Sequence, residues 1–137
     1  HDKFDVIQGT ATKLADDIGA KGILSLTSSG LSGRKLSRYR PKTHIYMFTH
    51  QRRVLNPMCG LWGVEPIAKI KEAGASRMIQ VMLEQLETKG HLDRQGTYIA
   101  TFGYPVGQPG STNTIKILTP SEMDYYLNLE KKPKKKK

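Results

Sequence analysis

The feature of the sequence that most constrains the fold is an alternation of helical and strand patterns along the chain. Apolar residues recur at every third or fourth position in the helical segments, while the strand segments are short runs rich in β-branched and aromatic residues. The expected helices cover residues 4–19, 32–39, 50–57 and 75–90, and the expected strands cover residues 22–27, 44–49, 61–67, 97–103 and 112–118. This alternation predicts an α/β fold, with a mainly parallel sheet and helices on both of its faces.

The end of the chain departs from this alternation. The connection between the last two expected strands is too short for a crossover, so the final strand is expected to lie antiparallel to the fourth. From Asp124 onward we expect a poorly anchored tail. The predicted organisation is therefore one structured domain at residues 1–119 and a tail at residues 120–137, with a lysine-rich end that is disordered. Trp62, on the third expected strand, is expected in the core.

Length and composition are those of a single globular domain, with 137 residues, 37% of them hydrophobic and 25% charged. No apolar run is long enough to span a bilayer, and no charged-then-apolar leader points to export. The single cysteine, Cys59, cannot form an internal disulfide and fits a reducing compartment, so a cytoplasmic location is expected. The chain begins with HDKF rather than with methionine, which suggests a processed or excised piece.

The formal net charge of +10 is concentrated at one end of the chain. The terminal segment EKKPKKKK supplies +5 of it, from six lysines less Glu130. A block of like charges is usually a solvated tail, and we favour this interpretation. Contact of the tail with an acidic partner or a phosphate backbone is the alternative. Neither nucleic acid nor a membrane is an expected partner.

The residue types that carry catalysis show no catalytic arrangement. His1, His44, His50 and His91 are scattered and have neither HExxH nor paired Cys/His spacing. A lone cysteine beside apolar residues, such as Cys59, is more often inert packing than a nucleophile. No paired carboxylates suggest an acid and a base. We therefore expect no catalytic residue and no metal site in this chain.

A hydroxyl-rich turn follows the first expected strand, in the stretch ILSLTSSGLSGRKLS. The helix after it leaves its first amide groups without intrahelical partners, and its dipole favours an anion there. The turn also lies at the carboxyl end of a strand, where open α/β sheets usually bind ligands. The residues alone leave two interpretations equally open, a phosphate site or an ordinary helix start with Ser29 or Ser32 as N-cap. The candidate phosphate-binding residues are Thr27, Ser28, Ser29, Gly30 and Ser32.

A second unusual stretch, GYPVGQPGSTNTIKIL, contains the connection between the last two strands. The connection is longer than a hairpin needs, and its prolines preorganise it. It follows the fourth strand, which would place it at the same edge of the sheet as the hydroxyl-rich turn. Two unusual loops at one edge predict a pocket. The residues singled out in the loop are Gly103, Tyr104, Pro105, Gly107 and Gly110.

Four stretches together resemble the C-terminal domain of pyruvate kinase, namely AKGILSLTSSG, LSRYRPKTHIYMFT, RRVLN with LWGVEPI, and FGYPVGQPGSTNTIKIL. Their order and spacing match from about residue 5 to residue 118. The resemblance implies a three-layer α/β/α domain around a five-stranded mixed sheet of order 3-2-1-4-5, with the last strand antiparallel. In this family the domain is regulatory and structural, and serves the allosteric regulation of a glycolytic enzyme.

The resemblance also implies where catalysis takes place. The family's active site, with its Mg²⁺ and K⁺ ions, lies in a barrel domain that precedes this one and is absent from this chain. The parent protein would be a phosphotransferase that converts phosphoenolpyruvate and ADP into pyruvate and ATP. This segment alone is expected to have no such activity and to need no cofactor.

In many family members the hydroxyl-rich turn binds a phosphate of a sugar-phosphate activator. By this resemblance, residues 27–32 would bind the phosphate and residues 103–110 would be an effector loop that folds over the ligand. Some members add three basic residues, but here the first two places hold Ser28 and Leu31, and Arg77, the nearest candidate for the third, is displaced by one residue. These departures weaken binding of a second phosphate, so a sugar monophosphate or plain phosphate is expected rather than fructose 1,6-bisphosphate.

Members of the family also assemble as tetramers through the first helix and the last strand. In this sequence the last strand would be an unprotected edge with Ile115 and Ile117 on one face, so a dimer along that edge is expected. A stand-alone relative that binds phosphate or another ligand, with a non-kinase role, is the alternative. A nucleic-acid-associated protein that works through its lysine tail is the third hypothesis.

Overall fold

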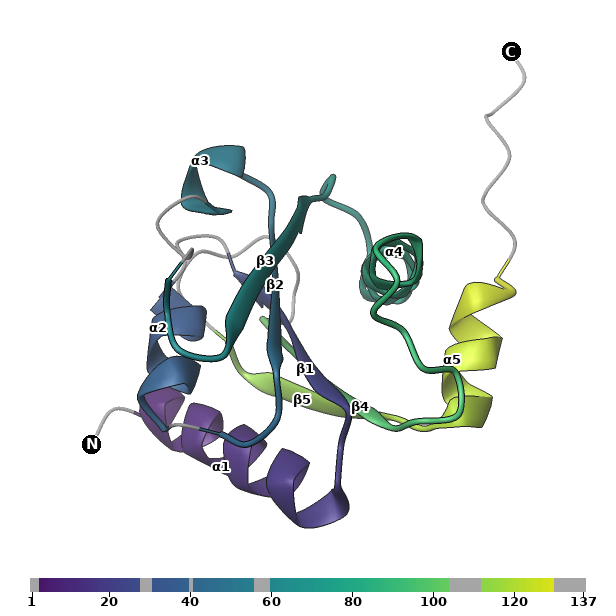
Figure 1. Cartoon of the computed structure of the whole chain (residues 1–137). Helices are drawn as coiled ribbons and strands as arrows, with labels where there is room; N and C mark the ends of the chain where they lie inside the picture. The colour runs from purple at the N-terminus through teal and green to yellow at the C-terminus, as the bar shows by residue number, and fades with distance from the viewer. Residues whose placement is uncertain (1–2, 28–30, 40, 56–59, 104–111, 130–137) are drawn as a thin grey trace.

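The computed structural model describes residues 3–27, 31–39, 41–55, 60–103 and 112–129 (Figure 1). Helices α1 and α2 cover one face of a central sheet, and helices α4 and α5 cover the other (Figure 1). The elements, in chain order, are α1 (Lys3–Ile18), β1 (Gly22–Thr27), α2 (Leu31–Arg38), β2 (Ile45–Thr49), α3 (Arg52–Leu55), β3 (Val64–Lys69), α4 (Ala75–Thr88), β4 (Tyr98–Phe102), β5 (Thr114–Leu118) and α5 (Pro120–Leu127).

The described strands form one sheet of order β3-β2-β1-β4-β5, with β1 at its centre. Strand β1 pairs parallel with β2 and β4, β2 pairs parallel with β3, and β4 pairs antiparallel with β5. The predicted α/β/α layers, strand order and antiparallel last strand are confirmed. Because four strands run in one direction, their ends meet at one edge of the sheet, the carboxyl edge, and their starts meet at the opposite amino edge.

The core lies on both faces of the sheet, because alternate residues of the central strands point to opposite layers. Ile23 and Ile99 pack in the layer of α1 and α2, while Leu24 and Phe48 pack in the layer of α4 and α5. The stripe predicted on α4 is buried throughout, at Met78, Ile79, Met82, Leu83 and Leu86. None of the described helices has the length and apolar character needed to cross a membrane.

Strand β3 begins later than the sequence suggests. The prediction covered residues 61–67, but the strand runs from Val64 to Lys69. The expectation that Trp62 lies in the core is wrong, because its side chain is 45% exposed and precedes the strand. The chain turns here through Gly63, which has a φ of 68°, a conformation that glycine adopts without steric cost. The strand preference of Trp62 therefore does not decide its environment.

The segment after β5 forms a helix rather than a poorly anchored tail. Helix α5 includes Asp124 and is followed by described residues up to 129, so the expected tail from Asp124 is wrong for residues 124–129. Met123 is fully buried in the layer that contains α4. The sequence pattern did not reveal this helix because Met123 is its only buried residue. The prediction for residues 130–137 concerns positions outside the described residues.

Local start signals explain why α5 begins where it does. Thr119 is the N-cap, and its Oγ1 accepts a hydrogen bond of 3.3 Å from the backbone N–H of Glu122. Pro120 occupies the first turn, where a missing N–H costs nothing. Glu122 also places a negative charge in that turn, which the helix dipole favours. These three signals, at residues 119, 120 and 122, were present in the sequence.

Candidate functional site

The candidate site begins at the end of the central strand. Strand β1 ends at Thr27, whose side chain is 5% exposed and is the register partner of Thr49 at the end of β2. Helix α2 begins at Leu31, so only three residues separate the strand from the helix. The carboxyl edge of the sheet therefore meets the N-terminus of an eight-residue helix at this point. This is the local arrangement in which an anion finds unpaired backbone N–H groups.

The structure places the predicted phosphate-binding residues only in part. Thr27 is at the end of β1, as predicted, and Ser32 lies in the first turn of α2. Ser28, Ser29 and Gly30 lie outside the described residues. Their roles, and the choice between a phosphate site and a capped helix start, stay predictions.

The connection from β4 to β5 begins at the end of a strand that pairs with β1. Strand β4 ends at Phe102, and it pairs directly with β1 through Ser25 and Thr101. Gly103 follows β4 at the carboxyl edge, and the two ends of the loop meet where the N–H of Asn113 donates to the carbonyl oxygen of Phe102 at 3.1 Å. The two stretches predicted to form a pocket therefore start from adjacent strands at the same edge. The loop residues Tyr104, Pro105, Gly107 and Gly110 lie outside the described residues.

Arg77, the possible third effector contact, points along its own helix. It lies in the first turn of α4, and its guanidinium donates to Oε1 of Gln80 and lies 3.6 Å from Oε1 of Glu84. These partners are three and seven residues further along α4, so the charged group is drawn away from the carboxyl edge at which α4 begins. The spacing of the three residues could have predicted this contact from the sequence.

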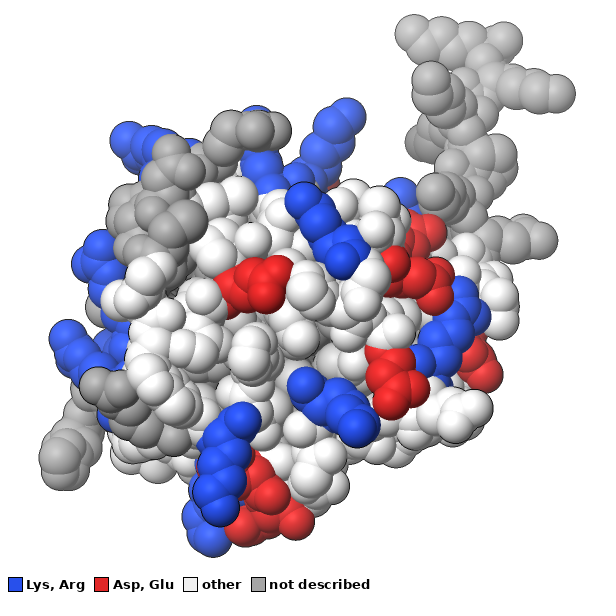
Figure 2. Space-filling model, in the orientation of Figure 1, with Lys and Arg blue, Asp and Glu red and all other residues white. Residues whose placement is uncertain are grey.

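Basic residues lie on the two helices that follow β1 and β2. This helix carries Arg34, Lys35 and Arg38 and has no acidic residue in its first turn, and α3 adds Arg52 and Arg53 after β2. In Figure 2 Lys and Arg gather on the left, where α2 and α3 lie, whereas Asp and Glu are interspersed with them over α4 and α5. The contribution of α3 was missed by the sequence reasoning, because its place beside β2 and β3 depends on the strand order. Positive charge at this edge favours an anionic ligand.

Two of the described histidines, His50 and His91, make polar contacts with β3 or with the residue that follows it. His50 Nδ1 lies 2.8 Å from the carbonyl oxygen of Ile70, and His91 Nε2 lies 2.6 Å from Oε2 of Glu65. No group of three or more His, Cys, Asp or Glu side chains among the described residues could hold a metal ion. Cys59 lies outside those residues. These contacts tie neighbouring loops to the edge strand, and they provide no assembled reaction centre.

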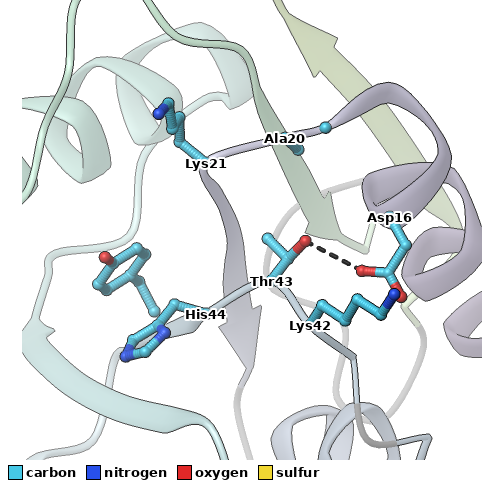
Figure 3. A pocket seen from close by; sticks show the side chains of 8 residues that line it. Asp16, Ala20, Lys21, Lys42, Thr43 and His44 are labelled. Carbon is cyan, nitrogen blue, oxygen red and sulfur yellow. Dashed lines mark hydrogen bonds between the residues drawn. The ribbon is translucent and has the colours of Figure 1, made fainter.

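A separate hollow of about 490 Å³ lies at the amino edge, between the end of α1 and the start of β2 (Figure 3). In its wall Thr43 Oγ1 donates a hydrogen bond of 3.1 Å to Oδ1 of Asp16, which joins α1 to the segment before β2. Lys21 and Lys42 also line the hollow. The C-terminal carbonyl groups of α1 and the carboxylate of Asp16 oppose the binding of an anion there. The hollow contains none of the predicted site residues.

The architecture defines a three-layer α/β/α domain with a loop-rich carboxyl edge. The sequence matches the family described as "Pyruvate kinase, alpha/beta domain" over residues 5–118. The chain therefore belongs to this family, and the resemblance found in the sequence is confirmed. Helix α5 lies beyond the matched residues.

Individual relatives agree with this assignment. The chain is 30% identical over 114 residues to a pyruvate kinase of Clostridium acetobutylicum, an alignment that covers 82% of this chain and 24% of that protein. It is 29% identical over 113 residues to a pyruvate kinase of Lactobacillus delbrueckii subsp. bulgaricus, with coverages of 82% and 19%. The chain thus spans about a fifth to a quarter of the length of these relatives.

Proposed function

We propose that this chain is the regulatory and assembly domain of a pyruvate kinase-like enzyme, and that it binds a phosphorylated effector at the turn after β1. The observation that carries the proposal is the short passage from the central strand, which ends at Thr27, to helix α2, which begins at Leu31. The residues between them are Ser28, Ser29 and Gly30. Two hydroxyl groups and a glycine at a helix N-terminus suit three phosphate oxygens.

Electrostatics supports an anionic ligand over a neutral one. The first turn of α2 contains no acidic side chain, so its dipole and its unpaired N–H groups act on the ligand without a competing carboxylate of that turn. Arg34 and Arg53 are exposed on the two helices that follow β1 and β2. Their charges raise the local concentration of anions before any contact forms.

The ligand we propose is a sugar monophosphate or plain phosphate. A bisphosphate needs a second set of cations, and the places that would supply two of them hold Ser28 and Leu31. The guanidinium of Arg77 supports the same choice, because it contacts Gln80 and Glu84 further along α4. The remaining hydroxyl and amide donors suit a single phosphate group.

The regulatory step would be a shift in population between two states of the carboxyl edge. Bound phosphate at residues 27–32 would order the loop that begins at Gly103, and this loop connects β4 with the edge strand β5. A change in the loop can therefore reach the edge at which we propose that two copies of the domain meet. A ligand shifts such an equilibrium only through its difference in affinity for the two states.

The proposed assembly surface is the outer edge of β5 together with α1. Strand β5 is the last strand of the described sheet, and Ile117 on it is 40% exposed. Helix α1 contacts β5, so both elements contribute to one side of the molecule. An edge strand with an exposed apolar residue is prone to pair with a second copy.

Catalysis by the parent protein is part of the proposal and lies outside this chain. The chain spans about a fifth to a quarter of its relatives' length, so a barrel domain with Mg²⁺ and K⁺ would be supplied by the rest of the protein. The role of the present domain would be to bind the effector and to transmit its effect.

The first experiment is a melting-temperature screen of the 137-residue chain. The ligands are phosphate, ribose 5-phosphate, glucose 6-phosphate, AMP and fructose 1,6-bisphosphate. A ligand at about a hundred times its Kd adds roughly 2.7 kcal/mol to the free energy of unfolding, which raises the Tm by several degrees. We expect such a shift with phosphate or a monophosphate.

Two variants make the screen specific. Ser29→Ala should abolish the shift, while Ser76→Ala, at an exposed serine in the first turn of α4, should leave it unchanged. No shift with any of the five ligands would leave the turn after β1 as a capped helix start and would refute the proposed binding site. A shift that survives Ser29→Ala would place the ligand elsewhere.

A stand-alone relative with a non-kinase role would bind phosphate in the same way. The native open reading frame separates the two possibilities. A frame extended by several hundred residues on the amino side would support a domain of a kinase, and a frame that begins close to residue 1 would support the stand-alone protein.

A further inference from the structure

Among the described residues, three buried polar atoms on α1 and on two strands that it contacts have no hydrogen-bond partner. They are Oε1 of Gln8 on α1, Oγ of Ser25 on β1 and Oγ1 of Thr101 on β4. The three side chains belong to residues that are at most 1% exposed. Buried polar groups in folded proteins almost always have partners, supplied by the protein or by ordered water. These atoms therefore need a partner other than the described side chains.

The sheet brings two of these atoms together. Ser25 and Thr101 are register partners in the parallel pair β1–β4. They lie two residues after Ile23 and Ile99, which pack in the layer of α1 and α2, and residues two apart in a strand share a face. Both hydroxyl groups therefore point toward the layer that contains α1.

Helix α1 carries the third atom on the face that it packs toward the same two strands. Gln8 lies on the buried stripe of α1 together with Ala11 and Ala15, and α1 contacts both β1 and β4. The helix ends at the amino edge and leads into β1, so it runs opposite to the strands. Gln8 is seven residues before Ala15, about 10 Å nearer to the carboxyl edge. Ser25 and Thr101 lie in the same direction from Ile23 and Ile99.

We propose that Gln8, Ser25 and Thr101 bind an internal water molecule between α1 and the centre of the sheet. A water molecule can donate to the amide oxygen of Gln8 and accept from the two hydroxyl groups, which gives it three hydrogen bonds, the usual number for buried water. The site lies behind Thr27, which is two residues beyond Ser25 on the same face of β1. The bound water ties α1 to the two strands that carry the loops of the carboxyl edge.

The test counts long-lived internal water in the 137-residue chain by ¹⁷O magnetic relaxation dispersion. We expect the wild-type protein to show such a molecule and Thr101→Val to show one fewer. The matched control is Thr49→Val, because Thr49 is equally buried but its hydroxyl accepts from the backbone N–H of Gln51 at 3.1 Å. This control should leave the water count unchanged.

Thermal stability gives an independent readout. If water is bound, Thr101→Val removes one of its partners and lowers the Tm by about 3–5 °C. If the hydroxyl is truly unpaired, the same substitution removes a desolvation cost and the Tm stays the same or rises. An unchanged water count or a raised Tm in Thr101→Val would overturn the proposal. Ser25→Ala provides the same comparison should the valine variant fail to fold.

Discussion

Gln80 of α4 donates a hydrogen bond of 2.8 Å through Nε2 to the backbone carbonyl oxygen of Leu129, 49 residues later in the chain. The other end of the same amide accepts from Arg77. One buried glutamine therefore connects the first turns of α4 with the segment that follows α5. This connection joins residues inside the family match to residues beyond it.

We predict that Gln80→Leu destabilises the domain although leucine is apolar and of similar size. The side chain of Gln80 is only 2% exposed, so its replacement leaves the carbonyl of Leu129 without this partner. Because Leu129 is only partly buried, the loss of this hydrogen bond should cost about 1 kcal/mol. Urea denaturation should show the loss, and Gln85→Leu on the same helix should change the free energy of unfolding by less. Equal effects of the two substitutions would contradict the role assigned to the Gln80–Leu129 bond.

Met123 should be the main anchor of α5. Its side chain is fully buried in the cluster that includes the buried stripe of α4. We expect Met123→Ala to lower the free energy of unfolding by about 2–5 kcal/mol, the range for truncation of a buried methionine. Chemical denaturation measures this loss, and Tyr125→Ala, at a residue that is 61% exposed, is the control on the same helix. A small effect of Met123→Ala would mean that α5 adds little to the domain.

The ion pair of Glu87 with Arg94 predicts a pH-dependent part of the stability. The side-chain hydrogen bonds from Arg94, at 2.6 and 2.8 Å, lower the pKa of Glu87 below its usual value. Because the folded-state pKa is depressed, the stabilisation is present above the unfolded-state pKa of about 4.3 and is lost as the pH falls through the folded-state value. Glu87→Gln should lower the Tm slightly near neutral pH and have no effect in strong acid.

The matched comparison repeats Glu87→Gln in a variant that lacks the other member of the ion pair, Arg94. In an Arg94→Gln background, Glu87→Gln should no longer lower the Tm at any pH, because the interaction is already gone. High salt should also reduce the wild-type advantage, since both side chains are about half exposed. A difference that persists in acid would show that Glu87 acts through packing rather than through charge.

The proposed dimer predicts a sensitive position on β5. Ile117→Lys would place a charge on the exposed edge strand, and lysine on an edge opposes pairing with a second copy. Light scattering should then report a dimer for the wild-type chain at high protein concentration and a monomer for the variant. Trp62→Lys, at a residue that is 45% exposed and precedes β3 at the opposite edge of the described sheet, is the control. A wild-type chain that is monomeric at every concentration would count against the assembly surface.

Much of the architecture could be predicted because it depends on local pattern. The run from Gly22 to Thr27 is a strand with the predicted bounds, and the stripe on α4 is buried as expected. Periodicity of apolar residues reports which face of an element is buried, and this is a property of neighbouring residues in the chain. The strand order itself was expected only from the family resemblance, because parallel pairing joins residues far apart in sequence.

The predictions that were wrong concern residues whose environment is decided by the tertiary structure rather than by local pattern. Trp62 has a strong preference for strands, but the turn at Gly63 leaves it exposed before β3. Helix α5 has clear start signals, yet its position on the sheet depends on the packing of Met123 against the buried residues of α4.

The sequence by itself indicated most of the elements, the family and the residues proposed to bind a phosphate, because propensity, periodicity and motif spacing are carried by contiguous stretches. Only the tertiary structure decided which of those residues come together. It placed Thr27 beside Thr49, Gly103 at the end of the strand next to β1, and Ser25 beside Thr101, whose buried hydroxyl groups have no partner among the described residues. Such pairings follow from strand order and helix packing. Their energies depend on how deeply each residue is buried, which a short segment of sequence does not specify.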